Sequence, residues 1–284
     1  MRLLNTKTLE VEEFPDNTPI YAILSHTWEK EEVDKIWNAC KYVQRYKFEW
    51  IWIDTCCIDK TSSAELSEAL NSMYKYYGEG RICIAYLSDV SNGRSLTGLD
   101  QFKKSRWFER GWTLQELIAP RHVVFLDQEW SSIGTRYGMR HVVSEVTSIP
   151  VKLFEGRSHE RGGELEDYSI AQRMSWAASR RTTREEDMAY CLMGIFGVNM
   201  PPIYGEGGAK AFMRLQLEII KYSDDQSIFA WVESEDCERN RGLFASSPSE
   251  FAPSGQICKS DSEDLGEKSS FSFSNNGLRI HLHL

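Results

Sequence analysis

Four short apolar runs, separated by helix-like segments, constrain the fold of this chain most strongly. The runs are continuously hydrophobic rather than alternating, and they occupy residues 20–24, 50–54, 82–87 and 122–126. Continuous hydrophobicity is typical of strands that are covered on both faces, as in a parallel sheet. Apolar side chains also recur at helical spacing between and after these runs, in residues 31–46, 62–77 and 107–119. Strands that alternate with helices predict βαβ crossovers and a doubly wound α/β sheet.

The composition changes after Pro150, which predicts a second region of different architecture. Residues 155–167 are rich in glycine and charge, as expected of an exposed linker. Helical spacing then returns in three segments, at residues 170–178, 184–196 and 209–222. We therefore expect an α/β core over residues 1–150, followed by a helical part over residues 151–225.

The last part of the chain, residues 226–284, is expected to extend this helical part. Residues 246–270 are serine-rich and polar, which favours a flexible loop. The final stretch, residues 271–284, alternates about an Asn-Gly pair and predicts a β-hairpin. Because the chain stops on a strand residue, we expect a further C-terminal region to follow in a longer protein.

Charge and cysteine usage exclude several classes of function. A net charge of −9 leaves no basic surplus for nucleic-acid phosphates. The N-terminus lacks the apolar run of a signal peptide, and no stretch has the length of a membrane span. Seven cysteines without a CxxC pair then indicate reduced thiols in an intracellular protein. We therefore expect a cytoplasmic protein that binds no membrane, no nucleic acid and no metal.

Polar side chains follow three of the apolar runs at their carboxyl ends. Ser25 and His26 follow the first run, Asp54 ends the second, and Asp89 follows the third. Ligands of α/β sheets bind outside the carboxyl ends of the strands, where the strand order reverses. We therefore expect Ser25, His26 and Asp54 to border one cleft with Glu116 from the next helix.

The segment that contains Glu116 has two interpretations, which the residues leave open. Trp112 and Glu116 are four apart and share one face of a helix, so the carboxylate lies beside a large indole ring. In the other interpretation, Thr113 and Glu116 form a capping box at the helix start. The first predicts a ligand site, and the second predicts only a stable helix end.

Other constellations point to different chemistry. His26 with Cys56 or Cys57 would make a base and a nucleophile, although no third orienting group is evident. A zinc site from these residues and Asp54 lacks the usual spaced pairs. The glycine-rich residues 205–210 lack the ending of a phosphate loop, and Arg180, Arg181 and Arg184 lie beside acidic partners.

Four longer motifs carry a family resemblance. They are YAILSHTW at residues 21–28, WIWIDTCCIDK at 50–60, WFERGWTLQELIAP at 107–120 and ASRRTTREEDMAYCLM at 178–193. In this order they resemble the fungal heterokaryon-incompatibility (HET) domain over about residues 20–220. The resemblance implies a role in cell death after fusion of unlike individuals. It also implies self-association and a partner module of the NACHT or NLR type.

The HET domain is in turn similar to TIR domains, which have a flavodoxin-like sheet. Some TIR domains cleave NAD with a glutamate on a helix after the third strand. Their helix motif, roughly W-C-x-x-E-L, is similar to residues 112–117, in which Trp112 and Glu116 take the matching places and Thr113 replaces the cysteine. The serine that precedes the tryptophan by two in TIR domains is Arg110 here. The resemblance therefore implies a TIR-like α/β fold and Glu116 as the catalytic residue.

NAD cleavage at the nicotinamide–ribose bond suits a single carboxylate. The reaction passes through an oxocarbenium-like state, and the leaving nicotinamide needs no proton because it already carries a positive charge. Ser25, His26 and Asp54 would then contact the substrate, and Trp28, Trp107 or Trp112 would stack on a ring. NAD is a substrate in this hypothesis, and no cofactor is expected. The alternative is a non-enzymatic module that self-associates and recruits partners to trigger cell death.

Overall fold

The computed structural model describes residues 1–27, 32–93, 95–155, 164–233, 242–259, 272–274 and 277–279. The chain divides into two compact units, Met1–Gly163 and Glu164–Leu284. Among the described residues, no helix combines the length and the hydrophobicity needed to cross a membrane.

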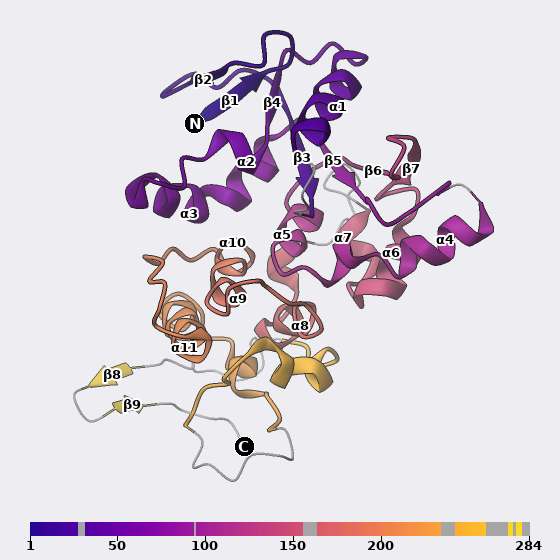
Figure 1. Cartoon of the computed structure of the whole chain (residues 1–284). Coiled ribbons are helices and arrows are strands. Elements are labelled where there is room, and N and C mark those ends of the chain that lie inside the picture. Colours follow the sequence, from indigo (N-terminus) through magenta and orange to yellow (C-terminus); the bar gives the residue numbers. More distant parts are fainter. Residues whose placement is uncertain are drawn as a thin grey trace. The chain divides into compact units, whose positions relative to one another are not determined.

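The first unit is built on a seven-stranded sheet in the order β2-β1-β4-β3-β5-β6-β7 (Figure 1). Its strands are β1 (Arg2–Asn5), β2 (Val11–Glu13), β3 (Tyr21–His26), β4 (Trp50–Trp52), β5 (Ile82–Tyr86), β6 (Val123–Leu126) and β7 (Ser132–Thr135). The four central strands are parallel, and the flanking strands pair antiparallel. The α/β class and the four predicted strands are confirmed.

The order of the parallel strands places the first and third of them side by side. The parallel strands lie in the sheet in the order β4-β3-β5-β6. Numbered 1 to 4 along the chain, this order is 2-1-3-4, which is also the order of the first four strands in flavodoxin-like sheets. Ser25 pairs with Ala85 and His26 with Tyr86 across the β3–β5 boundary. Strand order reverses here, so the carboxyl ends of β3 and β5 mark the expected ligand position.

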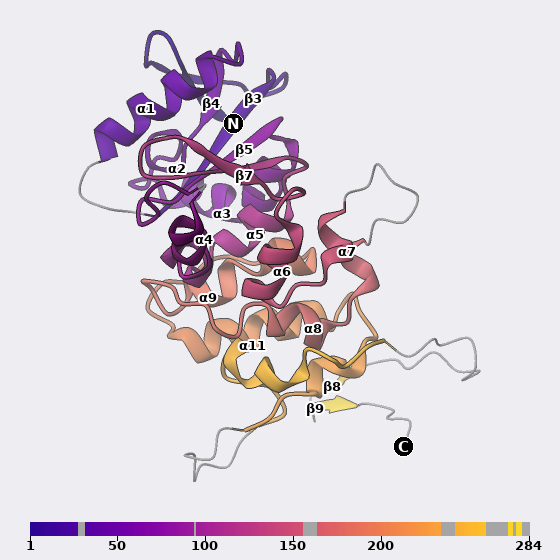
Figure 2. The same ribbon diagram turned by 90° about the vertical axis from the view of Figure 1, so that its right-hand side faces the viewer.

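Helices of the first unit connect and cover these strands. They are α1 (Glu32–Gln44), α2 (Asp54–Cys57), α3 (Ser63–Glu79), α4 (Leu96–Lys103), η1 (Arg106–Glu109), α5 (Thr113–Ile118), α6 (Arg140–Thr147) and α7 (Val151–Phe154). The helices α1 and α3 lie on opposite faces of the sheet (Figures 1 and 2). Right-handed crossovers to opposite sides of β3 require this arrangement. The core between them is fully buried and includes Ile23, Trp52 and Phe125.

Sequence spacing identified α1 and α3 correctly. Ser62 caps α3 by accepting a hydrogen bond from the Glu65 amide, as its position predicts. Glu65, however, binds the Asp59 amide at 2.8 Å instead of returning to the cap residue. The strands β1, β2 and β7 were not expected, because each is only three or four residues long, which is too short for a continuous apolar signal.

The second unit is helical. It contains η2 (Leu165–Asp167), α8 (Ile170–Ser175), α9 (Asp187–Tyr190), α10 (Met193–Phe196), α11 (Gly208–Ile219), η3 (Gln226–Phe229) and η4 (Pro248–Ser254). The predicted hairpin is confirmed by β8 (Ser272–Ser274), which pairs antiparallel with β9 (Gly277–Arg279). The serine-rich stretch was expected to be a loop throughout, but η4 forms inside it and buries Phe251.

One predicted helix of this unit is wrong in detail. Residues 184–196 form two short helices, α9 and α10, rather than one. Glu186 precedes α9 and stabilises the turn at residues 205–207, because its carboxylate accepts hydrogen bonds from the amides of Gly205 (2.8 Å) and Gly207 (3.3 Å). The glycine-rich loop therefore directs these amides to a side chain of its own unit. Both glycines have positive φ, of 96° and 86°, which the turn requires.

Candidate active site

Ser25 links the end of β3 to two side chains from the segment after β5. Its hydroxyl, on a fully buried residue, donates a hydrogen bond to Oε2 of Glu116. The Ser25 Oγ in turn accepts a hydrogen bond from the indole Nε1 of Trp107 at 2.8 Å. Ser25 is therefore connected by hydrogen bonds to two residues that lie 82 and 91 positions further along the sequence, inside the first unit.

Trp107 anchors this hydrogen-bonded group in the core of the first unit. The indole is fully buried, and its ring packs edge-on against Phe108 and Phe125 at centroid distances of 5.1 and 5.8 Å. We expected Trp107 among the rings that stack on a ligand, but a wholly buried indole has no free face. The indole Nε1, its only polar side-chain atom, orients the Ser25 hydroxyl. In this structure Trp107 therefore positions Ser25 and does not offer a ring face to a ligand.

Glu116 lies on the short helix α5, and the capping-box interpretation of its segment is wrong. Residues 107–119 do not form one helix, because the 3₁₀ helix η1 ends at Glu109 and α5 begins at Thr113. The Thr113 hydroxyl donates to the carbonyls of Trp107 (2.5 Å) and Arg110 (2.8 Å) instead of capping. Glu116 is thus released from a capping role, and its carboxyl group points to Ser25.

Burial changes the acidity of Glu116. The residue is 8% exposed, and desolvation raises the pKa of its carboxyl group to about 8. The nearby charge of Asp54 raises the pKa further, while hydrogen bonds from Ser25 and Tyr77 and the charge of Arg110 lower it. In this conformation Glu116 is therefore mostly protonated at neutral pH. A strongly shifted carboxyl group at a strand end is a common mark of a functional site.

His26 and Asp54 form a second polar contact beside this hydrogen-bonded group. Nδ1 of His26 lies 4.0 Å from Oδ1 of Asp54, and Nζ of Lys60 lies 3.9 Å from Oδ2. His26 is almost completely buried, whereas about a fifth of the Asp54 side chain is exposed. The charge of Asp54, which follows β4, also raises the pKa of Glu116 on α5. The two acidic groups are therefore close enough to influence each other's ionisation.

Two further ring residues, Trp28 and Trp112, were predicted at the site. Trp28 lies outside the described residues. Trp112 is half-buried and precedes the first residue of α5. The expectation that one of these two rings lines the site stays a prediction.

Tyr77 is a site residue that sequence reasoning missed. Its phenol is buried on α3 and donates its one proton to the Leu24 carbonyl at 3.1 Å, a proton that it shares with the Glu116 carboxyl group. Burial raises the pKa of Tyr77 well above its ordinary value, so the phenol keeps its proton. The helical stripe of residues 66–77 predicted that Tyr77 is buried, but the stripe carries no information about where the hydroxyl group points.

The cysteine-based alternatives receive no support from the geometry. The six described cysteines are free thiols, and the Cys56 and Cys57 sulfurs bond to backbone atoms of Ile51 and Ile53. Within the described ranges, no group of three or more histidine, cysteine or acidic side chains is arranged to hold a metal ion.

Replacing Ser25 with alanine is expected to destabilise the first unit. Ser25→Ala leaves the Trp107 indole N–H and one Glu116 oxygen without their buried partner, which typically costs about 1–3 kcal/mol per group. The free energy of unfolding, measured by urea denaturation, should fall by about 2 kcal/mol or more. In a double-mutant cycle with Trp107→Phe the two changes should be non-additive, because they remove the same hydrogen bond. Strict additivity would show that this bond is absent.

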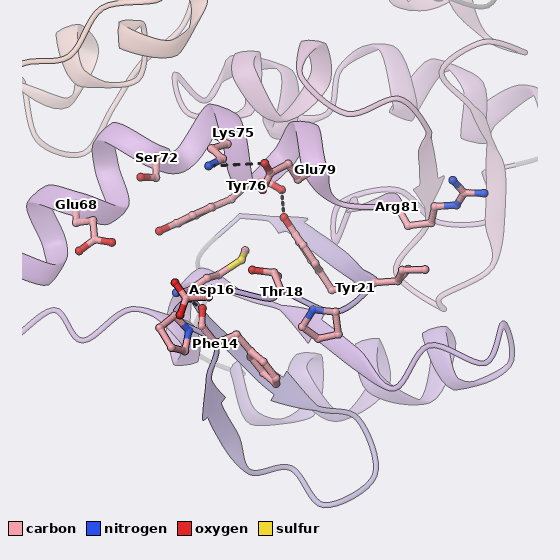
Figure 3. A pocket seen from close by; sticks show the side chains of 14 residues that line it. Phe14, Asp16, Thr18, Tyr21, Glu68, Ser72, Lys75, Tyr76, Glu79 and Arg81 are labelled. Carbon is pink, nitrogen blue, oxygen red and sulfur yellow. Dashed lines mark hydrogen bonds and ion pairs between the residues drawn. The ribbon is translucent and has the colours of Figure 1, made fainter.

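A separate groove lies at the opposite, amino-terminal end of β3 (Figure 3). It measures ≈ 600 Å³ and is bordered by the segment around Asp16 and by one side of α3, including Ser72 and Tyr76. The Tyr21 hydroxyl donates to the Tyr76 carbonyl at 2.6 Å and closes one wall. None of the predicted site residues lines this groove.

Comparison with known proteins identifies two regions. Residues 21–103 match the family "Heterokaryon incompatibility protein (HET)", and residues 210–284 match a domain of unknown function, DUF8212. The chain is 44% identical over 226 residues to the vegetative incompatibility protein HET-E-1 of Podospora anserina. This match covers 72% of the chain but only 16% of the length of that relative. No solved structure matches.

The matched family region contains the β3 and β4 strand ends with Ser25, His26 and Asp54, and the 226-residue match extends the similarity well beyond it. The chain is therefore a heterokaryon incompatibility (HET) domain protein.

Proposed function

We propose that this chain is an effector of vegetative incompatibility that hydrolyses NAD at the nicotinamide–ribose bond, with Glu116 as the catalytic residue. The hydrogen bond between Ser25 and a buried Glu116 of raised pKa carries the proposal. It places one carboxyl group at the strand ends where α/β sheets bind ligands. The similarity to HET-E-1, named as a vegetative incompatibility protein, supports the biological role.

The resemblance to TIR domains agrees with two further observations. The parallel strands follow the order 2-1-3-4, as in flavodoxin-like sheets. Glu116 lies on a helix after the third parallel strand, β5. These features support a TIR-like interpretation, in which activity would depend on self-association of the chain.

The chemistry follows from the charge of Glu116. Its ionised carboxylate would grip the ribose hydroxyls and stabilise the positive charge that develops as nicotinamide leaves. Ser25 and Tyr77 would hold the carboxylate in position, since both already hydrogen-bond to it. Burial excludes water, which strengthens this electrostatic interaction.

The rate of NAD cleavage is expected to rise with pH. Glu116 acts as the anion, and its anionic fraction grows as the pH passes through about 8. In kcat/KM, which reports the free enzyme, the rise should therefore be centred near this value. In kcat the midpoint should be lower, because the positively charged nicotinamide ring of bound NAD favours the carboxylate. Rates of nicotinamide release across a pH series would test this, and a rate that falls as pH increases would contradict it.

Expression in cells separates the enzymatic proposal from the recruitment alternative. If the proposal is correct, the parent chain should lower cellular NAD and kill, while Glu116→Gln should do neither. A matched variant is Glu145→Gln, whose carboxylate is exposed on α6, and it should behave as the parent. Killing by Glu116→Gln without loss of NAD would favour a non-enzymatic module that self-associates and recruits partners.

A further inference from the structure

Two adjacent cysteines form a pair of sulfurs in contact on the helical turn α2. The Sγ atoms of Cys56 and Cys57 lie 4.0 Å apart. The turn is only four residues long, and extended backbone at Ile53 and Ile58 flanks it on both sides. A short turn between extended residues can change conformation without unwinding a longer helix.

The two thiols have different environments. Cys57 is buried, and its sulfur accepts a hydrogen bond from the Ile53 amide at 3.4 Å. Cys56 is half-buried and directs its sulfur to the Ile53 carbonyl at 3.7 Å. The hydrogen bond from Cys56 lowers the pKa of Cys57, whereas the same contact and burial raise the pKa of Cys56. The pair therefore combines a buried sulfur of lowered pKa with a partner thiol nearer the surface.

We propose that Cys56 and Cys57 are a redox modification site, which hydroperoxides oxidise to a disulfide between adjacent residues. The Cys57 thiolate attacks the peroxide oxygen, the O–O bond breaks, and a sulfenic acid forms while water leaves after protonation. The Cys56 sulfur then attacks the sulfenic sulfur, the S–S bond forms, and a second water leaves. In total, two thiols and one hydrogen peroxide give one disulfide and two waters.

Oxidation must reshape the turn. The Cα atoms of neighbouring residues lie about 3.8 Å apart, which is closer than the roughly 4.4–6.8 Å that disulfides prefer. The disulfide is therefore strained and easily reduced again, as expected of a regulatory bond rather than a structural one. The helical bond from the Cys57 amide to the Ile53 carbonyl, now 2.8 Å, lies directly within the distorted backbone.

The same turn begins with Asp54, which gives the modification a local consequence. Its carboxylate lies 4.0 Å from His26 and 3.9 Å from Lys60. A change in the turn would shift this carboxylate relative to the end of β3. The modification itself does not depend on NAD cleavage, so it can be tested even if the proposed function is wrong.

The test treats the purified chain with hydrogen peroxide and maps the product by peptide mass spectrometry. In the parent, the peptide that contains both residues should lose two hydrogen atoms, and dithiothreitol should restore it. Cys56→Ser and Cys57→Ser should each block this product. Cys258→Ser, which removes an exposed lone thiol, should leave it unchanged.

A second measurement keeps the test decisive if Cys57→Ser fails to fold. Phenylarsine oxide bridges two thiols in contact and releases water, so one molecule should bind per parent chain and none to Cys56→Ser. Oxidation that stops at a single cysteine, or a disulfide from Cys56 to the buried neighbour Cys40, would overturn the proposal. Equal oxidation of that peptide in the parent and in Cys56→Ser would also overturn it.

Discussion

Raising the pH from about 5 to about 9 is expected to lower the free energy of unfolding of the parent by several kcal/mol more than that of Glu116→Gln. The pKa of Glu116 is about 8 in the folded chain, well above its ordinary value of 4.5. Between these values the folded state holds a proton that the unfolded state has released. The contribution of this group to stability is therefore complete at low pH and is lost as pH rises through 8.

The size of this effect follows from the shift. Stability should fall by up to about 1.4 kcal/mol per pH unit, and by on the order of 5 kcal/mol once Glu116 is ionised in both states. Glutamine has nearly the same shape but does not titrate. Denaturant unfolding of both proteins across the pH range measures the difference between their free energies of unfolding. The contributions of all other titrating groups cancel in this difference, because both proteins contain them.

Glu145→Gln provides the matched control for this measurement. Glu145 is largely exposed and pairs with Lys103 at 2.8 Å, so its replacement should leave the pH slope of the parent unchanged. If the parent and Glu116→Gln lose stability in parallel, Glu116 titrates normally and the buried, proton-holding site described above is wrong.

Glu116→Gln is also expected to reduce NAD cleavage by about 10²–10³-fold. The amide can still accept the hydrogen bond from Ser25 but carries no negative charge to stabilise the oxocarbenium-like state. Because the shape and the hydrogen bond are retained, the variant should stay folded, which circular dichroism would verify. A folded variant with the parental rate would remove Glu116 from the mechanism.

Much of the sheet could be predicted because the central strands are buried on both faces. Continuous apolar runs marked β3, β4, β5 and β6 within one or two residues. The edge strands gave no such signal, since β2 is exposed along its whole length and β7 is half-buried at three residues and exposed at the fourth. Burial on both faces is visible in a sequence, whereas pairing at an edge depends on neighbours from distant segments.

The candidate site was predicted in part. Strand ends and helix order pointed to Ser25 and Glu116, and the structure joins these two residues by a hydrogen bond. The position of Trp107 could not be foreseen, because its neighbours in the sequence do not reveal that Phe125 packs on its ring. Thr113 misled for a related reason, since its hydroxyl bonds to carbonyls that come near only when α5 separates from η1.

The most direct test of the account is the release of free nicotinamide from NAD by the purified parent chain. The concentrated protein is incubated with NAD near pH 9, where Glu116 is mostly ionised, and the products are separated by chromatography. Nicotinamide and ADP-ribose should appear in equal amounts, each matching the NAD consumed. Intact NAD after prolonged incubation with folded, self-associated protein would contradict it.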